Sequence, residues 1–115
     1  MSKYFSYETD PKMACSCCNV KKLDPHVIAV LTLVREHFNE PVIITSGYRC
    51  PKHNKAVGGA PKSKHVEGIA VDFKVKGKLP EQVFEYLNDM FPDTYGLGVY
   101  PTWVHLDVRK EKARW

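Results

Sequence analysis

The sequence predicts an α+β fold in which two main helices pack against a small, mainly antiparallel sheet. Three observations support this prediction. Apolar residues recur at three- and four-residue steps over residues 25–38, and a second helical pattern starts at Pro80. Short β-branched or alternating segments occupy residues 42–45, 69–75, 95–100 and 103–109. The length of 115 residues suits a single domain with one hydrophobic core.

The first helix is predicted to start at Asp24-Pro25, because Asp24 suits the N-cap and Pro25 suits the first helical position. Its buried face is marked by apolar residues at helical spacing, namely Val27, Ile28, Leu31, Val34 and Phe38. The residues Asn39-Glu40-Pro41 end this helix. The next run, Val42-Ile43-Ile44-Thr45, is rich in β-branched residues and predicts the first strand.

Residues 50–64 predict a loop, because they contain two prolines, two glycines and few apolar side chains. A loop of about 15 residues usually has a functional role. The segment 69–75 follows it and alternates as a strand does. Its odd-numbered apolar residues share one face, and Asp72 lies on the opposite face.

The second helix is predicted to start at Pro80 and to end before Pro92. Its inward face is formed by Val83, Phe84 and Leu87. Two further strands follow, joined by a tight turn at Pro101-Thr102. On the last strand His105 and Asp107 share one face. The opposite face supplies the core with Val104, Leu106 and Val108.

Residues 1–22 are polar, irregular and rich in cysteine, and we interpret them as an N-terminal arm laid on a domain formed by residues 23–115. The four cysteines are Cys15, Cys17, Cys18 and Cys50. The crowding of the first three does not match a standard paired zinc site. The thiols can stay reduced in a cytoplasm, or one of the first three can pair with Cys50 after release from the cell. The sequence leaves both alternatives open, together with a four-thiolate zinc site.

The composition, with 43% apolar and 26% charged residues, is that of an ordinary globular protein. We expect neither a membrane span nor a signal peptide, because no apolar run is long enough and the first eight residues contain none. The net charge is +4, and lysines recur over residues 52–78. This charge suits attraction to a polyanion such as an anionic cell wall, or a solvated basic surface. No aromatic-interleaved basic motif is present, so we expect no nucleic-acid partner.

Three side chains have the chemistry of a catalytic zinc site: His65, Asp72 and His105. Two imidazoles and one carboxylate leave a fourth position for water. Gly68 permits a sharp turn that brings His65 back towards Asp72. His105 has apolar neighbours, and a buried histidine needs a partner. That partner is a metal ion, or it is Asp72 in a buried polar pair without a metal.

Several motifs occur in one order along residues 42–109. They are Ser46-Gly47-Tyr48-Arg49-Cys50-Pro51, His53-Asn54, Val57-Gly58-Gly59, Ser63-x-His65-x-x-Gly68-x-Ala70-x-Asp72-Phe73, Gly96-x-Gly98-x-Tyr100 and Val104-His105-x-Asp107-x-Arg109. In these motifs the chain resembles the zinc D-alanyl-D-alanine carboxypeptidase and L-alanyl-D-glutamate endopeptidase family. These are peptidoglycan peptidases, and small members occur among bacteriophage proteins. The resemblance implies a hedgehog/D-Ala-D-Ala-peptidase-like fold.

The resemblance also implies roles for particular residues. His65, Asp72 and His105 match the zinc ligands of the family. Arg49 matches an arginine that positions the substrate and stabilises the oxyanion, and Ser63 matches a serine that contacts the substrate. The chemistry agrees, because a guanidinium offers a fork of donors to a carboxylate or a polarised carbonyl. The alternative for Arg49 is a surface or structural ion pair.

One position departs from the family pattern. Many members carry a glutamate or aspartate three residues before the last histidine ligand as the general base, and others carry a histidine two residues before it. This chain has Thr102 and Trp103 there, and neither accepts a proton near neutral pH. Asp107 is our first candidate for the base, with the alternative that it orients a ligand imidazole. Glu67 is the second candidate, with the alternative that it is exposed to solvent.

The sequence therefore predicts a zinc metallopeptidase that cuts a peptide bond in the stem peptide of peptidoglycan, as a carboxypeptidase or an endopeptidase. The alternatives are a zinc-containing cell-wall-binding module that does not cut, and a structural module of a phage particle. We expect a monomer with Zn²⁺ as its cofactor. It would be made in the cytoplasm and act at the cell wall after release, as an endolysin does, or as part of a phage particle.

Overall fold

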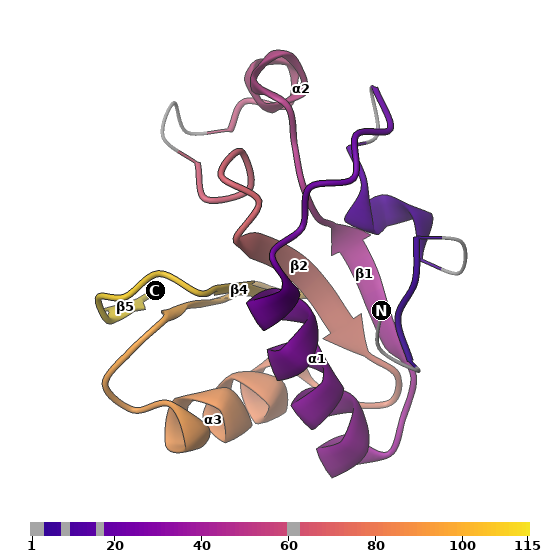
Figure 1. Ribbon diagram of the computed structural model, residues 1–115. Coiled ribbons are helices and arrows are strands. Elements are labelled where there is room, and N and C mark those ends of the chain that lie inside the picture. The colour runs from indigo at the N-terminus through magenta and orange to yellow at the C-terminus, as the bar shows by residue number, and fades with distance from the viewer. Residues whose placement is uncertain (1–3, 8–9, 16–17, 60–62) are drawn as a thin grey trace.

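The computed structural model describes residues 4–7, 10–15, 18–59 and 63–115. Its centre is a five-stranded sheet with the order β1-β2-β4-β3-β5 (Figure 1). The strands are β1 (Val42–Ser46), β2 (Ala70–Val75), β3 (Gly96–Val99), β4 (Val104–Asp107) and β5 (Ala113–Arg114). All neighbouring pairs are antiparallel except β3 and β5, which run parallel. The prediction of an α+β fold with a mainly antiparallel sheet is confirmed.

Two helices, α1 (Pro25–Phe38) and α3 (Pro80–Met90), supply the helical layer. The side chain of Asp24 accepts a hydrogen bond of 2.8 Å from the backbone N–H of His26, which caps the start of α1. At its other end Asn39 adopts a left-handed conformation with φ of 52°. Both predicted ends of this helix are therefore confirmed.

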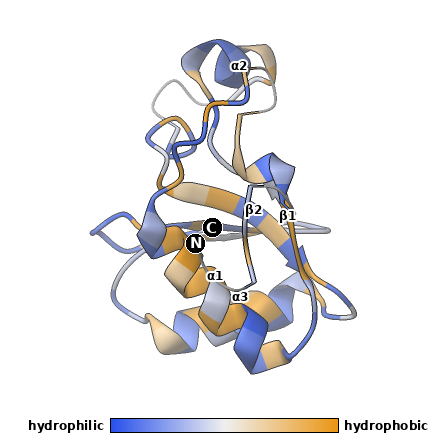
Figure 2. Ribbon diagram, turned by 45° about the vertical axis from the view of Figure 1, so that its right-hand side comes forward, coloured by the Kyte–Doolittle hydropathy of each residue, from blue (hydrophilic) through white to orange (hydrophobic). Residues whose placement is uncertain are grey.

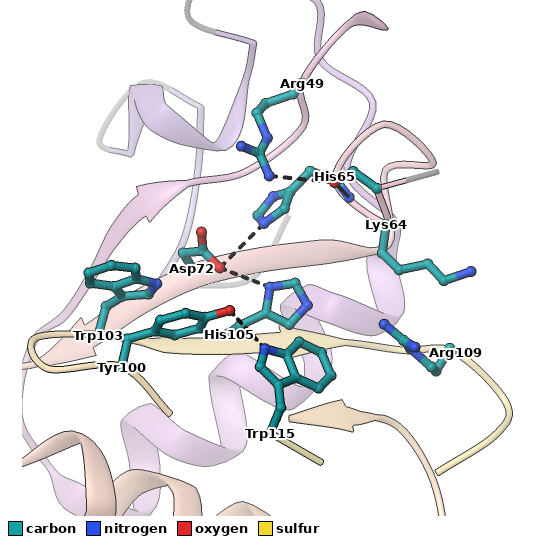
Figure 3. A pocket seen from close by; sticks show the side chains of 10 residues that line it. Arg49, Lys64, His65, Asp72, Tyr100, Trp103, His105, Arg109 and Trp115 are labelled. Carbon is teal, nitrogen blue, oxygen red and sulfur yellow. Dashed lines mark hydrogen bonds and ion pairs between the residues drawn. The ribbon is translucent and has the colours of Figure 1, made fainter. Parts of the chain in front are cut away.

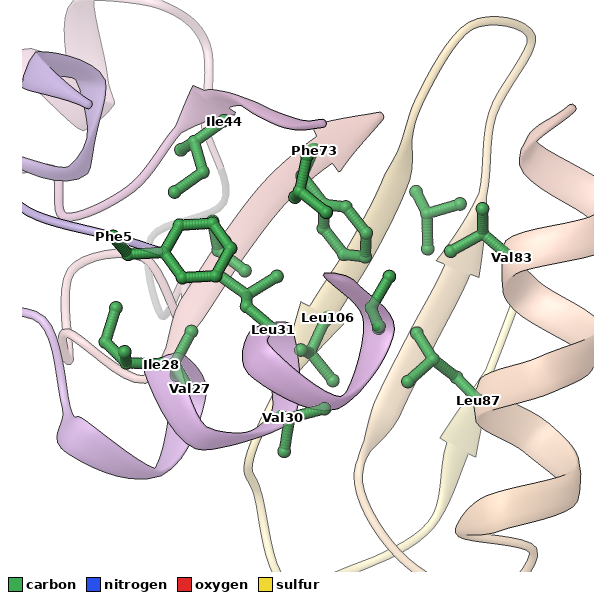
Figure 4. Close-up of a cluster of buried hydrophobic side chains, with 14 of the residues drawn as sticks. Phe5, Val27, Ile28, Val30, Leu31, Ile44, Phe73, Val83, Leu87 and Leu106 are labelled. Atoms are coloured by element: carbon green, nitrogen blue, oxygen red, sulfur yellow. The ribbon is translucent and has the colours of Figure 1, made fainter. Parts of the chain in front are cut away.

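The core lies between these helices and one face of the sheet (Figure 4). Apolar side chains of α1 and α3, such as Leu31 and Leu87, pack there with Phe73 of β2 and Leu106 of β4, and all four are fully buried. Figure 2 shows hydrophobic residues along α1 and alternating on β2. Because neighbouring residues on a strand point to opposite faces, Asp72 and His105 lie on the face turned away from this core.

The pairing of β2 with β4 fixes that arrangement. Asp72 lies directly opposite His105, and Phe73 lies opposite Val104. Directly opposed residues on neighbouring strands point to the same face of the sheet. The register thus brings a carboxylate and an imidazole together on one face while it brings apolar side chains together on the other.

Two elements differ from the sequence-based prediction. The loop predicted over residues 50–64 contains a short helix, α2 (Pro51–Ala56). Its polar sequence gives no apolar stripe, because less than two helical turns are too few for a periodic pattern. It lies at the opposite end of the molecule from α3 (Figures 1 and 2). The short strand β5 was also not predicted.

The described part of the N-terminal arm packs closely on the rest of the chain. It includes a short 3₁₀ helix, η1 (Pro11–Met13), beside β1. Met13 is fully buried, and its backbone oxygen accepts a hydrogen bond of 3.1 Å from the backbone N–H of Tyr48. Phe5 also belongs to the hydrophobic core. Within the described residues no helix is long and apolar enough to cross a membrane.

Candidate metal centre

His65, Asp72 and His105 converge on one side of the sheet (Figure 3). One ligand atom from each side chain lies within 4.8 Å of the other two. Asp72 Oδ1 lies 3.3 Å from Nε2 of His65 and 2.9 Å from Nδ1 of His105. Ligand atoms about 2.1 Å from a tetrahedral zinc ion lie about 3.4 Å from one another, so these separations suit one shared ion.

The turn that carries His65 depends on Gly68. Gly68 has a φ of 78°, a conformation that side-chain-bearing residues rarely adopt. A Cβ atom at this position would also collide with the backbone oxygen of Lys22. The same backbone region is held by a hydrogen bond of 2.7 Å from the N–H of Asp24 to the carbonyl of Gly68. The end of the N-terminal arm at Lys22 and the N-cap of α1 at Asp24 thus fix the turn that aims His65 at Asp72.

The orientation of the His65 ring is set by the backbone. Its Nδ1 lies 2.8 Å from the carbonyl oxygen of Gly47. A carbonyl only accepts hydrogen bonds, so Nδ1 carries the proton and donates it. In the neutral ring, Nε2 then presents its lone pair towards Asp72. The ring is 2% exposed and has no room to turn away.

His105 is oriented by a carboxylate on its own strand. Its Nε2 lies 2.8 Å from Oδ2 of Asp107, which is fully buried. Arg109 holds Asp107 in turn, because its Nε and Nη2 donate to the two carboxylate oxygens at 2.7 Å each. Burial would raise the pKa of Asp107, but the hydrogen bonds from His105 and Arg109 outweigh it and lower that pKa below its usual range. Asp107 is thus a fixed acceptor for His105 Nε2–H.

The donor set fits a metal ion. The nitrogens that face away from Asp72 are Nδ1 of His65 and Nε2 of His105. When only these two are protonated, both imidazoles direct lone pairs at the negatively charged Asp72, and a cation between them stabilises this arrangement.

Without an ion, Asp72 can accept hydrogen bonds from these rings only when the facing nitrogens also carry protons. Burial would raise the pKa of Asp72, but those hydrogen bonds from His105 and His65 lower it to about 2, so this ligand is ionised. Burial would lower the pKa of His105, but Asp107 and Asp72 raise it. The lowered pKa of Asp72 and the raised pKa of His105 both show that the site favours positive charge. A second proton on an imidazole or one divalent ion supplies that charge.

The three side chains line a cleft of about 360 Å³. Its other described lining residues are Arg49, Ser63, Lys64, Tyr100, Trp103, Arg109 and Trp115. Three of these carry positive charge. Three are aromatic and form a wall in which Tyr100 and Trp103 stack at 4.6 Å between ring centroids. Trp115 joins it through a hydrogen bond of 2.7 Å from its Nε1 to the Tyr100 hydroxyl.

Arg49 and Ser63, the predicted substrate-binding residues, both line this cleft. Nη2 of Arg49 lies 3.5 Å from Oγ of Ser63, at the limit of a hydrogen bond. The Nε of Arg49 is buried and has no hydrogen-bond partner among the described residues. A buried donor without an acceptor is costly, so this guanidinium has unused capacity for a ligand in the cleft.

The two predicted candidates for the general base are placed differently. Asp107 lies behind His105, away from solvent, with both oxygens hydrogen-bonded. Glu67 is exposed and forms an ion pair of 3.0 Å with Lys64. Among the described residues that line the cleft, Asp72 is the only carboxylate. Sequence reasoning did not assign Tyr100, Trp115, Lys64 or Arg109 to the site, although Tyr100 and Arg109 stand in the motifs noted above.

Two histidines and an aspartate that converge in an open cleft are the ligand set typical of a metal-dependent hydrolase. The sequence matches the model of the Peptidase M15 family over residues 4–107, most of the chain. The chain therefore belongs to the Peptidase M15 family, whose members are zinc-dependent metallopeptidases. No curated protein matches the sequence.

Gly96→Ala tests how strictly Asp107 must be placed. Gly96 lies opposite Asp107 across β3 and β4, and a Cβ atom there would collide with both carboxylate oxygens. We expect the displaced carboxylate to release His105 and to weaken zinc binding by about 10- to 100-fold, as loss of a ligand-orienting partner does. Competition with a chromophoric chelator measures this. Gly77→Ala is the control for general destabilisation, because alanine is strained at its φ of 74° while the added Cβ atom meets nothing within 4 Å. Unchanged zinc binding in Gly96→Ala, or an equal loss in Gly77→Ala, would contradict the expectation.

Proposed function

We propose that this chain is a zinc peptidase that hydrolyses a peptide bond in the stem peptide of peptidoglycan. The observation that carries this proposal is the convergence of His65, Asp72 and His105 at the base of an open cleft, in a chain of the Peptidase M15 family. We assign these three residues as the zinc ligands. A bound zinc ion would supply a water of lowered pKa and would polarise the carbonyl that is attacked.

The side chains around the ligands would bind the substrate, stabilise the oxyanion and orient the ligand imidazoles. We propose that Arg49 donates hydrogen bonds to the oxygen of the scissile carbonyl as it becomes negative, or to a carboxylate of the peptide. Ser63, which is within reach of Arg49, would hold the peptide beside it. His65 and His105 stay neutral as ligands, because Gly47 and Asp107 hold their outer protons.

The charge and shape of the cleft support a stem peptide as substrate. Arg49, Lys64 and Arg109 line it, whereas its one described carboxylate is the assigned ligand Asp72. Stem peptides carry free carboxylates, which such a cationic cleft attracts. The aromatic wall formed by Tyr100, Trp103 and Trp115 would pack against the apolar parts of the substrate. We further propose that the protein acts as a monomer at the cell wall, after release from the cell or as part of a phage particle.

We propose that Asp107 orients His105 rather than accepting the proton of the attacking water. Its full burial and its paired contacts with Arg109 support this role. Asp107→Asn then puts an N–H donor against His105 Nε2, which favours the tautomer with the proton on Nδ1 and removes the ligand lone pair. We expect zinc affinity to fall about 10- to 100-fold, with turnover per bound zinc retained when zinc is added in excess.

The measurement for Asp107→Asn combines zinc titration with hydrolysis of a defined stem peptide. Asp89→Asn, at an exposed position of α3, is the matched control. A variant that keeps its zinc but loses turnover would instead assign Asp107 as the general base, the role first considered for it.

The second candidate function is a zinc-containing module that binds cell wall without cutting it. The observation that favours it is that Asp72 is the only described carboxylate lining the cleft, with Thr102 and Trp103 at the positions where the family pattern places a base. Purified protein incubated with purified cell walls, with and without a chelator, separates the candidates. Newly freed amines that disappear with the chelator support the peptidase. Sedimentation of the protein with the walls, without freed amines, supports the binding module. If neither freed amines nor sedimentation is observed, the result supports a structural role.

A further inference from the structure

A second group of metal-ligating side chains lies outside the His65-Asp72-His105 centre. The sulfur atoms of Cys15, Cys18 and Cys50 lie within 4.8 Å of one another. Cys15 and Cys18 belong to the N-terminal arm, whereas Cys50 immediately precedes α2, in the segment that leads away from β1 (Figure 1). The fold thus brings together thiols that are far apart in the chain. Cys17, the fourth cysteine, lies outside the described residues.

Backbone hydrogen bonds hold the described residues on either side of Cys15 and Cys18. Although the three crowded cysteines together do not match a standard paired zinc site, Cys15 and Cys18 taken alone have the C-x-x-C spacing of paired zinc ligands. Asn19, directly after the second cysteine, has a left-handed φ of 58°. Two backbone hydrogen bonds join Cys15 to the residues that follow Cys18, from the N–H of Asn19 to the carbonyl of Cys15 at 2.8 Å and from the N–H of Cys15 to the carbonyl of Val20 at 3.1 Å.

Backbone amides also point at the sulfur atoms. The N–H of Cys50 donates to Sγ of Cys15 at 3.4 Å, and the N–H of His53 donates to Sγ of Cys50 at 3.4 Å. These donors orient the two sulfur atoms, as hydrogen bonds from surrounding groups orient metal ligands. Cys18 is exposed, so an ion can reach the group from solvent.

We propose that Cys15, Cys18 and Cys50 together bind a second zinc ion. Each thiol would release its proton to solvent on binding, because the thiolate is the ligand. Three thiolates favour a soft tetrahedral ion such as Zn²⁺ over hard cations such as Mg²⁺ or Ca²⁺. All protein ligands of this site differ from those of the His65-Asp72-His105 centre.

This ion would fasten the N-terminal arm to the segment that supports the cleft. That segment contains Gly47, whose carbonyl accepts the Nδ1 proton of His65, and Arg49, whose N–H donates to the carbonyl of His65 at 3.2 Å. Gly47 also packs so closely on Met13 that a Cβ atom would lie 2.5 Å from the Met13 carbonyl oxygen. Binding at Cys15 and Cys50 would therefore hold Arg49 and His65 in place without contact with the substrate.

Cobalt substitution tests the proposal on the whole chain. Cobalt bound by thiolates shows intense sulfur-to-metal charge-transfer absorption in the near ultraviolet, whereas cobalt bound by histidine and aspartate does not. We expect this absorption in the wild type and in His65→Ala, and its loss in Cys50→Ser. Zinc content is expected to be two equivalents in the wild type and one in each variant. Absence of sulfur charge transfer in cobalt-loaded wild type would overturn the proposal whether or not the peptidase site binds metal.

Thiol counting gives a second measurement that needs no variant. Purification without reductant followed by reaction with Ellman's reagent in denaturant and chelator should detect all four cysteines of the chain. In native protein the thiols of Cys15, Cys18 and Cys50 should react slowly until a chelator removes the ion. Detection of two thiols in denaturant would instead show a disulfide and overturn the proposal, as would fast reaction of native, zinc-loaded protein.

Discussion

His65→Ala and His105→Ala are each expected to abolish zinc binding at the His65-Asp72-His105 centre. Each substitution removes one of only two nitrogen ligands and leaves the Asp72 carboxylate with a single imidazole beside it. Two remaining protein ligands do not make a stable zinc site, because catalytic zinc is held by three. Metal analysis after dialysis against a weak chelator should show one equivalent of zinc less than in the wild type. Chelator-sensitive hydrolysis should disappear with it.

The control for these variants is His26→Ala. His26 is exposed at the start of α1, where its imidazole contacts Asp24 at 3.3 Å. Its removal takes away an imidazole of the same chemistry outside the cleft, so zinc content should stay that of the wild type. Zinc content equal to the wild type in His65→Ala or His105→Ala, with the fold intact by circular dichroism, would contradict the assignment of that residue as a ligand.

The sequence predicted those parts of the fold that depend on local pattern. Asp24-Pro25 and Asn39 marked the ends of α1, because caps and breakers act within a few residues. The alternation in 69–75 placed Asp72 on the face opposite Phe73, because the side-chain period of a strand is two. The same reasoning put His105 and Asp107 on one face, where the structure joins them by a hydrogen bond of 2.8 Å.

The sequence did not predict features that arise from long-range contacts. Trp115 reaches the cleft because β5 pairs with β3, and a two-residue strand has no pattern of its own. The burial of Asp107 depends on Arg109, which neutralises it, and on Gly96, which leaves room for it. The gathering of Cys15, Cys18 and Cys50 depends on the arm packing beside the segment after β1, which spacing along the chain does not show.

The structure shows which ring nitrogen of each histidine faces the candidate metal site, which the sequence motif does not. The ligand motif names His65 and His105 without saying which nitrogen binds. The structure presents Nε2 of His65, because Gly47 accepts from its Nδ1, and Nδ1 of His105, because Asp107 accepts from its Nε2. One orienting partner is a backbone carbonyl and cannot be removed by substitution. The other is a side chain, so the tautomer of His105 is the one that mutation can change.

Arg49→Ala is expected to lower kcat/KM for a defined stem peptide by about 10²- to 10³-fold, the usual loss when one oxyanion donor is removed. The residue is suited to that role because it lines the cleft and its Nε is buried without a partner among the described residues. Its guanidinium approaches Ser63 Oγ at 3.5 Å, which leaves other donors for the substrate. Zinc content should not change, because Arg49 is not among the assigned ligands.

The division of the loss between kcat and KM identifies what Arg49 contacts. A donor to the developing oxyanion acts only in the transition state and lowers kcat, whereas a donor to a substrate carboxylate raises KM. Arg49→Lys should recover little, because an ammonium lacks the planar fork of donors. The matched control is Lys52→Ala, which removes one positive charge from the exposed surface of the neighbouring helix α2. Equal losses in Lys52→Ala and Arg49→Ala would show that general positive charge, and not the Arg49 guanidinium, serves the substrate.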